Sequence, residues 1–174
     1  MQIAIQEITK IDAAGAQLYE AITLFFERRS PIAVHTLVMA AHQLLHDYTD
    51  RAKSMLKNEK TIREYGKDRI HRFNKEFNFF KHSVGDKDEV LKFDPELHTY
   101  FLIDAIYLFA AATGEWPHIH QVFNFWFILK YPHMVTTEQA IAAVQTAQRG
   151  GWKFEQFEAF RELINRPTEQ NLGI

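Results

Sequence analysis

Three histidines spaced along one predicted helix are the residues of this chain best suited to chemistry. At about 100° per residue, His35, His42 and His46 point in nearly the same direction and form a stripe beside an apolar helix face. Imidazole titrates near neutral pH, binds metal ions and transfers protons. The stripe therefore predicts a site where this helix meets its neighbours.

His42 and His46 are one turn apart, the arrangement in which two imidazoles of a helix can share a metal ion. Metal sites in helix bundles use side chains from facing helices, so the third ligand would be His82, His98 or Asp104. The alternative is that both histidines are hydrogen-bonded in a helix interface. We expect no cofactor, with a divalent metal ion as the alternative.

Asp104 is a single carboxylate in the most apolar segment of the chain, between Ile103 and Ala105. An unpaired carboxylate in such surroundings costs several kcal/mol. Asp104 must therefore find a partner or stay protonated, and the candidates are histidines of neighbouring helices, or Lys81 and His82. Such a pair is either a structural contact or an oriented base or metal ligand.

A second polar stripe contains Asn78 and His82, one turn apart in the string NFFKH. Consecutive helices joined by a short connection pack antiparallel, which places the start of the His35 helix near the end of this one. We therefore expect His35, Asn78, Lys81, His82 and Asp104 to line one small pocket.

Other catalytic motifs are absent, or rest on spacing alone. The chain has no cysteine, no GxSxG and no glycine-rich phosphate loop, so thiol chemistry is excluded and serine triads are not indicated. Arg28 and Arg29 precede His35 by seven and six positions. This spacing resembles the arginine–histidine pair of HEPN ribonucleases, and the resemblance implies ribonuclease activity as an alternative function.

The elements that position these residues are predicted to be helices almost throughout. Apolar residues recur at helical spacing, and capping signals such as Thr9 with Asp12, Ser30-Pro31, Thr136 with Gln139 and Gly114 mark helix ends. We predict an all-α single-domain bundle of six or seven helices over residues 1–174, with a frayed tail at 166–174. The expected helices are 9–27, 31–57, 68–82, 94–114, 116–131, 136–150 and 157–164.

Length and composition favour one folded domain. The chain has 174 residues, of which 47% are hydrophobic and 15 are Phe, enough to bury a continuous core. The absence of cysteine suits a reducing compartment. The N-terminus does not resemble a secretory signal, and no run reaches the ~18 apolar residues of a membrane span. We expect a cytoplasmic protein with no membrane partner.

The charges are unevenly distributed along the chain. Residues 51–92 carry 12 Lys or Arg against 7 Asp or Glu, whereas the formal net charge of the whole chain is −2. A basic segment of this kind either attracts an anionic partner such as a nucleic acid or neutralises an acidic neighbour. The sequence pI of about 6.5 lies below the range typical of nucleic-acid binders, which favours the second interpretation.

The aromatic run FNFWFIL predicts assembly. It places aromatic side chains around most of its helix, more than the interior of a small bundle needs. Large exposed apolar patches usually mark interfaces. We therefore expect a homodimer in which Trp126 or Phe127 is buried.

Three strings resemble an uncharacterised family of small all-α bacterial proteins: SPIAVHTLVMAAHQLLHD, NFFKHSVGDKD and FDPELHTYFLIDA. The resemblance covers roughly residues 9–130. The chain departs from the family pattern at Ser30, where Asp is usual, and at His42 and His46. The family has no known activity, so the resemblance implies only the helical segmentation.

Taken together, these patterns predict a cytoplasmic helical binding protein. Its His/Asn/Asp-lined pocket would lie between the second, third and fourth predicted helices, for a ligand that is a small molecule or a nucleic acid. The alternatives are a hydrolase, metal-dependent or of the ribonuclease kind, and a structural subunit whose histidines satisfy one another.

Overall fold

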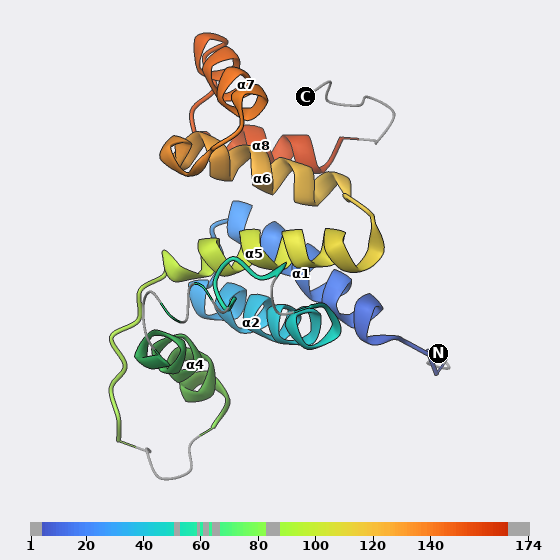
Figure 1. Cartoon of the computed structure of the whole chain (residues 1–174), viewed down its shortest axis with the longest axis vertical. Helices are drawn as coiled ribbons and strands as arrows, with labels where there is room; N and C mark the ends of the chain where they lie inside the picture. Colours follow the sequence, from blue (N-terminus) through green and yellow to red (C-terminus); the bar gives the residue numbers. More distant parts are fainter. Residues whose placement is uncertain are drawn as a thin grey trace.

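The computed structural model describes residues 5–50, 53–58, 60, 63, 67–82 and 88–166 (Figure 1). Within these residues the chain forms seven α-helices and one 3-10 turn, which confirms the predicted all-α fold. The helices are α1 (Lys10–Phe26), α2 (Pro31–Tyr48), α4 (Lys67–Lys81), α5 (Leu97–Thr113), α6 (His118–Lys130), α7 (Glu138–Arg149) and α8 (Phe157–Ile164), and the 3-10 turn is Pro132–Met134.

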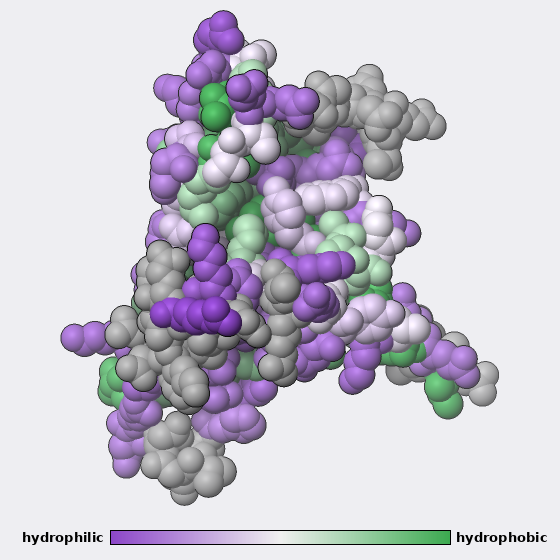
Figure 2. All heavy atoms as spheres, in the orientation of Figure 1, coloured by the Kyte–Doolittle hydropathy of each residue, from purple (hydrophilic) through white to green (hydrophobic). Residues whose placement is uncertain are grey.

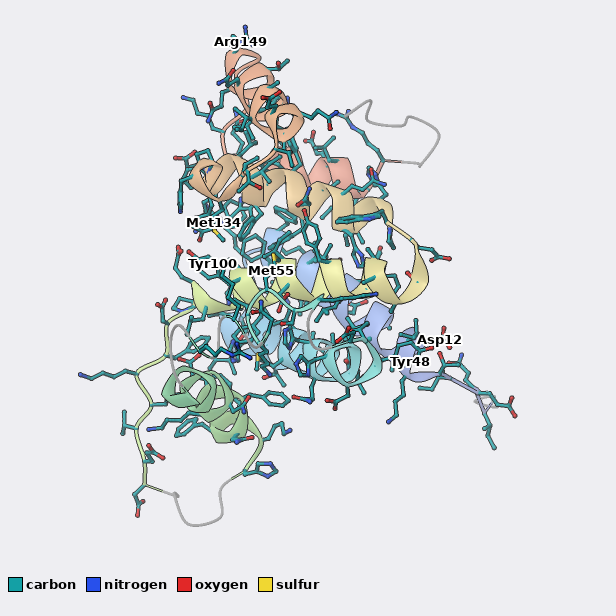
Figure 3. The ribbon with its side chains drawn as sticks, viewed as in Figure 1. Asp12, Tyr48, Met55, Tyr100, Met134 and Arg149 are labelled. Atoms are coloured by element: carbon teal, nitrogen blue, oxygen red, sulfur yellow. The ribbon has the colours of Figure 1, made fainter. Side chains whose placement is uncertain are left out.

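The helices are stacked around α5 (Figure 1). On one side of α5, α1 and α2 form an antiparallel pair, so that Asp12 near the start of α1 and Tyr48 at the end of α2 lie at the same end of the molecule (Figure 3). On the other side lie α6 and α8, with α7 packed against α6. Helix α4 packs against α2 at the far side of the stack.

Helix α1 begins and ends with local hydrogen bonds that the sequence specifies. The predicted capping box is present, because the Asp12 N–H donates to Thr9 Oγ1 and the Thr9 N–H donates to Asp12 Oδ2. At the other end, the Arg28 N–H donates to the Phe25 carbonyl and the Arg29 N–H to the Leu24 carbonyl. This is a Schellman motif, in which Arg28 has φ = 54° at the position that usually holds glycine.

Three predicted boundaries are wrong for local reasons. Helix α2 ends at Tyr48 rather than near residue 57, because Thr49 is extended and the next described residues, 53–58, form a separate turn. Helix α5 begins at Leu97, since Asp94 and the residues after it form a turn. The cap of α7 is Thr137 rather than Thr136. Of the tail expected at 166–174, only residue 166 is among the described residues.

The core is centred on α5, which is buried on nearly all sides as its sequence predicts. Trp126 and Phe127 of α6 are only 1% and 5% exposed. Trp126 contacts Phe25 and Phe157 of the same chain, and Phe127 contacts Tyr100. The prediction that one of them is buried in a dimer interface is therefore wrong, because helices of the same chain already cover both.

The surface in Figure 2 is mostly hydrophilic over α7, while white and green side chains gather over the middle of the stack. Among the described residues, no helix has the length and apolar character needed to cross a membrane.

Candidate functional site: buried histidines on both sides of α2

Asp104 accepts hydrogen bonds from two side chains and two backbone groups. Its Oδ2 accepts from His42 Nε2 at 2.8 Å, from Ser54 Oγ at 2.7 Å and from the Leu56 N–H at 3.4 Å. Its Oδ1 accepts from the Met55 N–H at 2.7 Å. The predicted pairing of Asp104 with a histidine from a neighbouring helix is confirmed. The residues of the 53–58 turn were not predicted as partners, since a backbone donor leaves no signal in the sequence.

The protonation of this pair follows from its surroundings. Burial alone would raise the pKa of Asp104, but the hydrogen bond and proximity of His42, together with the Ser54 and Met55 donors, lower it. Burial lowers the pKa of His42 by more than Asp104 raises it. Asp104 is therefore ionised and His42 neutral, with the hydrogen of His42 on Nε2.

Lys57 of the same turn is also buried, and the charge of Asp104 acts on it. It is 7% exposed, and burial lowers its pKa although the charges of Asp104 and Asp47 raise it. Asp104 and His42 are fully buried, and both oxygens of the carboxylate are used. This arrangement attaches the 53–58 turn to α5.

A second group of buried polar side chains lies where α2 meets α4 and α5, and we call it the His35 cluster: His35 of α2, Glu76 of α4 and His98 of α5, whose pKa is influenced by the charge of His35. His35 is fully buried, with Nε2 at 3.8 Å from Glu76 Oε2, beyond hydrogen-bond range. Its ring contacts the edges or faces of Phe80, Phe93 and Phe101 at centroid distances of 5.8, 5.4 and 6.3 Å. Within the described part of the chain, neither nitrogen of His35 has a hydrogen-bond partner.

Each of the other two members has one buried polar atom without a partner among the described residues. His98 is 5% exposed and packs against Phe25, and its Nδ1 is the unpartnered atom. Glu76 is 6% exposed, and its unpartnered atom is Oε2. Burial lowers the pKa of His35 to about 4. Burial, together with the nearby charge of His35 when it is protonated, lowers the pKa of His98 to about 4. Burial also raises the pKa of Glu76, although the Asp94 N–H opposes it.

The remaining residues of the predicted pocket lie elsewhere. Asn78, Lys81 and His82 are exposed at the C-terminal end of α4, with Lys81 Nζ at 3.8 Å from the centre of the Phe77 ring. The structure thus places His35 beneath α4 and these three side chains in solvent, and it brings Asp104 to His42 instead. Glu76 and His98 take the places that we had assigned to Asn78 and His82. Glu76 was missed because it is one of many charged residues in a basic, polar helix.

The two histidines of the proposed metal pair lie side by side. The rings of His42 and His46 are nearly parallel, 6.0 Å apart. Within the described part of the chain, no three His, Cys, Asp or Glu side chains are arranged to hold a metal ion. The arginine–histidine pair is also separated, since Arg28 lies over Phe157 of α8 whereas His35 faces Phe80 of α4.

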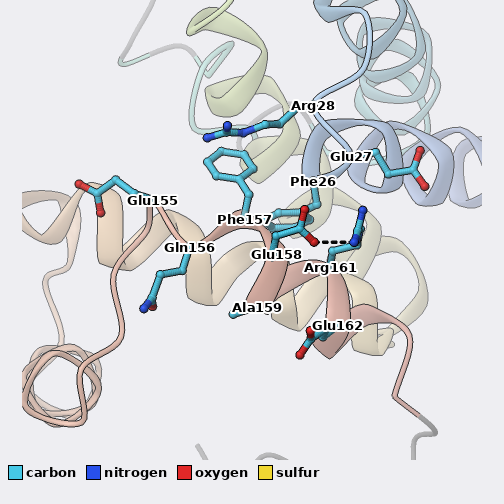
Figure 4. A pocket seen from close by; sticks show the side chains of 10 residues that line it. All are labelled: Phe26, Glu27, Arg28, Glu155, Gln156, Phe157, Glu158, Ala159, Arg161 and Glu162. Carbon is cyan, nitrogen blue, oxygen red and sulfur yellow. Dashed lines mark ion pairs between the residues drawn. The ribbon is translucent and has the colours of Figure 1, made fainter.

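A cavity lies between the end of α1 and the start of α8 (Figure 4). We call it the α1–α8 cavity; it has a volume of about 490 Å³ and is lined by residues 26–28, 155–159, 161 and 162. Its two walls are far apart in sequence, so no motif could indicate it.

Comparisons with protein-family models, with curated proteins and with solved structures find no match to this chain. The resemblance to a family of small bacterial proteins therefore stays a prediction.

Proposed function

We propose that the protein is a helical binding protein and that its ligand occupies the His35 cluster. One observation carries the proposal: four buried polar atoms of this cluster, on three side chains from three helices, have no hydrogen-bond partner among the residues that the structure describes. A buried polar atom without a partner costs about 1–3 kcal/mol. A ligand that supplies the missing donors and acceptors would recover part of that free energy.

The charges of the cluster favour an uncharged ligand. Both histidines are neutral at pH 7, because their pKa values lie at about 4. Burial raises the pKa of Glu76, and an ion in this aromatic surrounding would have to be desolvated. Neutral imidazole offers one donor and one acceptor. The ligand class is therefore a small, uncharged molecule that both donates and accepts hydrogen bonds.

Helix α4 would control access to this site. Glu76 and Phe80 of α4 and Phe93 of the segment before α5 cover His35. Of the described helices, α4 makes its main contact with α2 alone. Local opening of such a peripheral element requires less free energy than global unfolding. A ligand would reach His35 when α4 moves away from α2.

The test is a titration of the whole protein at pH 8, followed by the NMR signals of its histidine rings. The probes are imidazole, pyrazole and acetamide, with acetate and guanidinium as charged molecules of similar size. We expect the uncharged probes to shift the signals of His35 and His98. Equal shifts with the charged probes, or none with any probe, would contradict the proposal.

His120 provides the matched control. It is also buried, with Nδ1 unpartnered and a pKa lowered by burial to about 4. It packs against Phe109, toward the other end of α5. His35→Phe should abolish the response to the probes, whereas His120→Phe should leave it unchanged. If both variants lost the response, the NMR shifts would reflect the overall stability of the protein rather than binding at the His35 cluster.

A homodimer and a cytoplasmic location are the remaining parts of the proposal. The dimer now rests only on the fact that twofold-symmetric dimers are the commonest soluble oligomers, because Trp126 and Phe127 no longer support it. Light scattering at tens of micromolar protein tests it, and a monomer at that concentration would exclude a stable dimer.

A further inference from the structure

We infer that the α1–α8 cavity binds a small organic cation that carries a guanidinium group. The cavity measures about 490 Å³, within the range of about 300–1,000 Å³ that is usual for small-molecule sites. It lies between α1 and α8, whereas the His35 cluster joins α2, α4 and α5. The inference is therefore independent of the function proposed above.

The cavity has an aromatic floor. Phe26 and Phe157 pack edge to face with centroids 6.0 Å apart, and Trp126 supports Phe157 from the core side. The guanidinium carbon of Arg28 lies 4.6 Å from the centre of the Phe157 ring, and Figure 4 shows the two groups facing one another. This is the geometry of a cation–π contact. The floor thus already accommodates a guanidinium group from its own chain.

Arg28 holds that place weakly. Its side chain is exposed, and no ion pair of Arg28 occurs among the described residues. Its backbone has φ = 54°, a left-handed conformation that disfavours every residue with a Cβ relative to glycine. A ligand with the same cationic group can replace Arg28 on the ring without breaking a salt bridge.

The charge around the cavity selects for cations. Four carboxylates line it, from Glu27, Glu155, Glu158 and Glu162, against two guanidinium groups. Arg161 is engaged by Glu158, as the dashed line in Figure 4 marks. The surplus of negative charge attracts a cation and repels an anion. The ring face and this surplus point to the same class of ligand.

The experiment is an NMR titration of the full chain with agmatine, a small guanidinium compound. N-butylurea serves as an uncharged analogue of similar shape, and added NaCl controls for ionic strength. We expect agmatine to shift the backbone signals of residues 26–28 and 155–162, and N-butylurea to leave them in place. An acetylated arginine amide serves as a mimic of an arginine side chain in a peptide, whereas agmatine represents a free ligand. Equal binding of the two compounds would show that the guanidinium group alone is recognised.

Two variants decide the outcome. Arg28→Gly removes the internal occupant and relieves the backbone, so agmatine should bind several-fold more tightly, in the range of about three- to thirty-fold expected of a cation–π contact. Phe157→Leu should weaken binding by a similar factor, and Tyr107→Leu, at an exposed aromatic residue outside the cavity, should not. Unchanged or weaker binding by Arg28→Gly, which does not disturb the core, would overturn the inference even if Phe157→Leu failed to fold.

Discussion

Asp104 shows how one buried carboxylate can be stabilised without chemistry. Its oxygens receive hydrogen bonds from the imidazole of His42, from the hydroxyl of Ser54 and from two backbone N–H groups of the same turn. Hydrogen bonds to a charged acceptor are the stronger kind. They make the ionised form of Asp104 the stable one inside the bundle.

This set of donors predicts the order of two substitutions. Asp104→Leu leaves His42 and Ser54 buried without this acceptor and removes the acceptor of the two part-buried backbone groups, and we expect a loss of about 3–5 kcal/mol in the free energy of unfolding. Asp104→Asn keeps one acceptor oxygen in nearly the same shape and should cost about 1–3 kcal/mol. Urea denaturation measures both. Asp47→Asn, at a carboxylate that is 62% exposed and accepts hydrogen bonds from Gln43, should change the value by less than ~0.5 kcal/mol.

The opposite order would have a clear meaning. If Asp104→Leu were as stable as the parent protein, the pairing with His42 would be replaceable by apolar packing, and the backbone donors of Met55 and Leu56 would have to find other acceptors. The attachment of the 53–58 turn to α5 through this carboxylate would then be wrong.

At the scale of elements, the 53–58 turn depends on α5 rather than on α2. The Met55 N–H donates to Asp104 at 2.7 Å although the Met55 side chain is 44% exposed, and Figure 3 shows Met55 beside α5. We expect this amide to exchange with solvent at least about tenfold more slowly than a free turn amide. Hydrogen exchange by NMR checks this, and Asp104→Asn should accelerate the exchange of Met55 but not of amides within α6.

Helix α4 gives a second prediction at this scale, because it excludes water from His35. Phe80→Ala should let water reach the imidazole and raise the pKa of His35 from about 4 toward the ordinary value of about 6.5. An NMR pH titration of the histidine rings measures it. The pKa of His120, which burial against other elements lowers to about 4, should stay in place. An unchanged pKa of His35 would mean that α4 does not protect it.

These elements also show which features the sequence could predict. The capping box of Thr9 and Asp12 and the left-handed Gly114 after α5 depend on nearby residues, and both were predicted. The end of α2 was not predicted. The backbone N–H groups of Met55 and Leu56, which the predicted longer helix would have used internally, instead donate to Asp104 on α5, about fifty residues away.

The candidate site follows the same rule. Periodicity correctly placed His35 and Asp104 in the interior, since both lie on apolar helix faces. It could not identify Glu76, because its helix is polar on average and the facing elements decide which carboxylate is buried. The walls of the α1–α8 cavity meet only in three dimensions.

For the whole molecule, the buried histidines determine how stability depends on pH. Burial lowers the pKa values of His35, His98 and His120 to about 4, whereas in the unfolded chain they are about 6.5. Between these values the unfolded chain binds more protons than the folded one. The free energy of unfolding therefore falls as the pH decreases from about 6.5 to about 4.

The size of this effect is comparable to the stability of a typical domain. At pH 5 each of the three histidines costs about 2 kcal/mol, against a total stability of roughly 5–15 kcal/mol. Glu76 acts in the opposite direction, because its raised pKa lets the folded state take up a proton as the pH falls. The lowered pKa of Asp104 adds to the loss of stability only at lower pH. This loss begins when the pH approaches about 3.9, where the carboxylate of Asp104 becomes protonated in the unfolded chain.

We therefore expect urea denaturation to give a steep decrease in stability between pH 7 and pH 5, with unfolding at or below the lower value. His120→Phe removes one of the three histidines without touching the His35 cluster. Because burial also lowers the pKa of His42, which contributes to the same slope, the slope should fall by less than a third. His133→Phe, at an exposed histidine, should leave the slope unchanged and serves as the control. A stability that is constant or rises from pH 7 to pH 5 would mean that the folded protein accepts protons at these imidazoles, and that the interior around α5 is open to water.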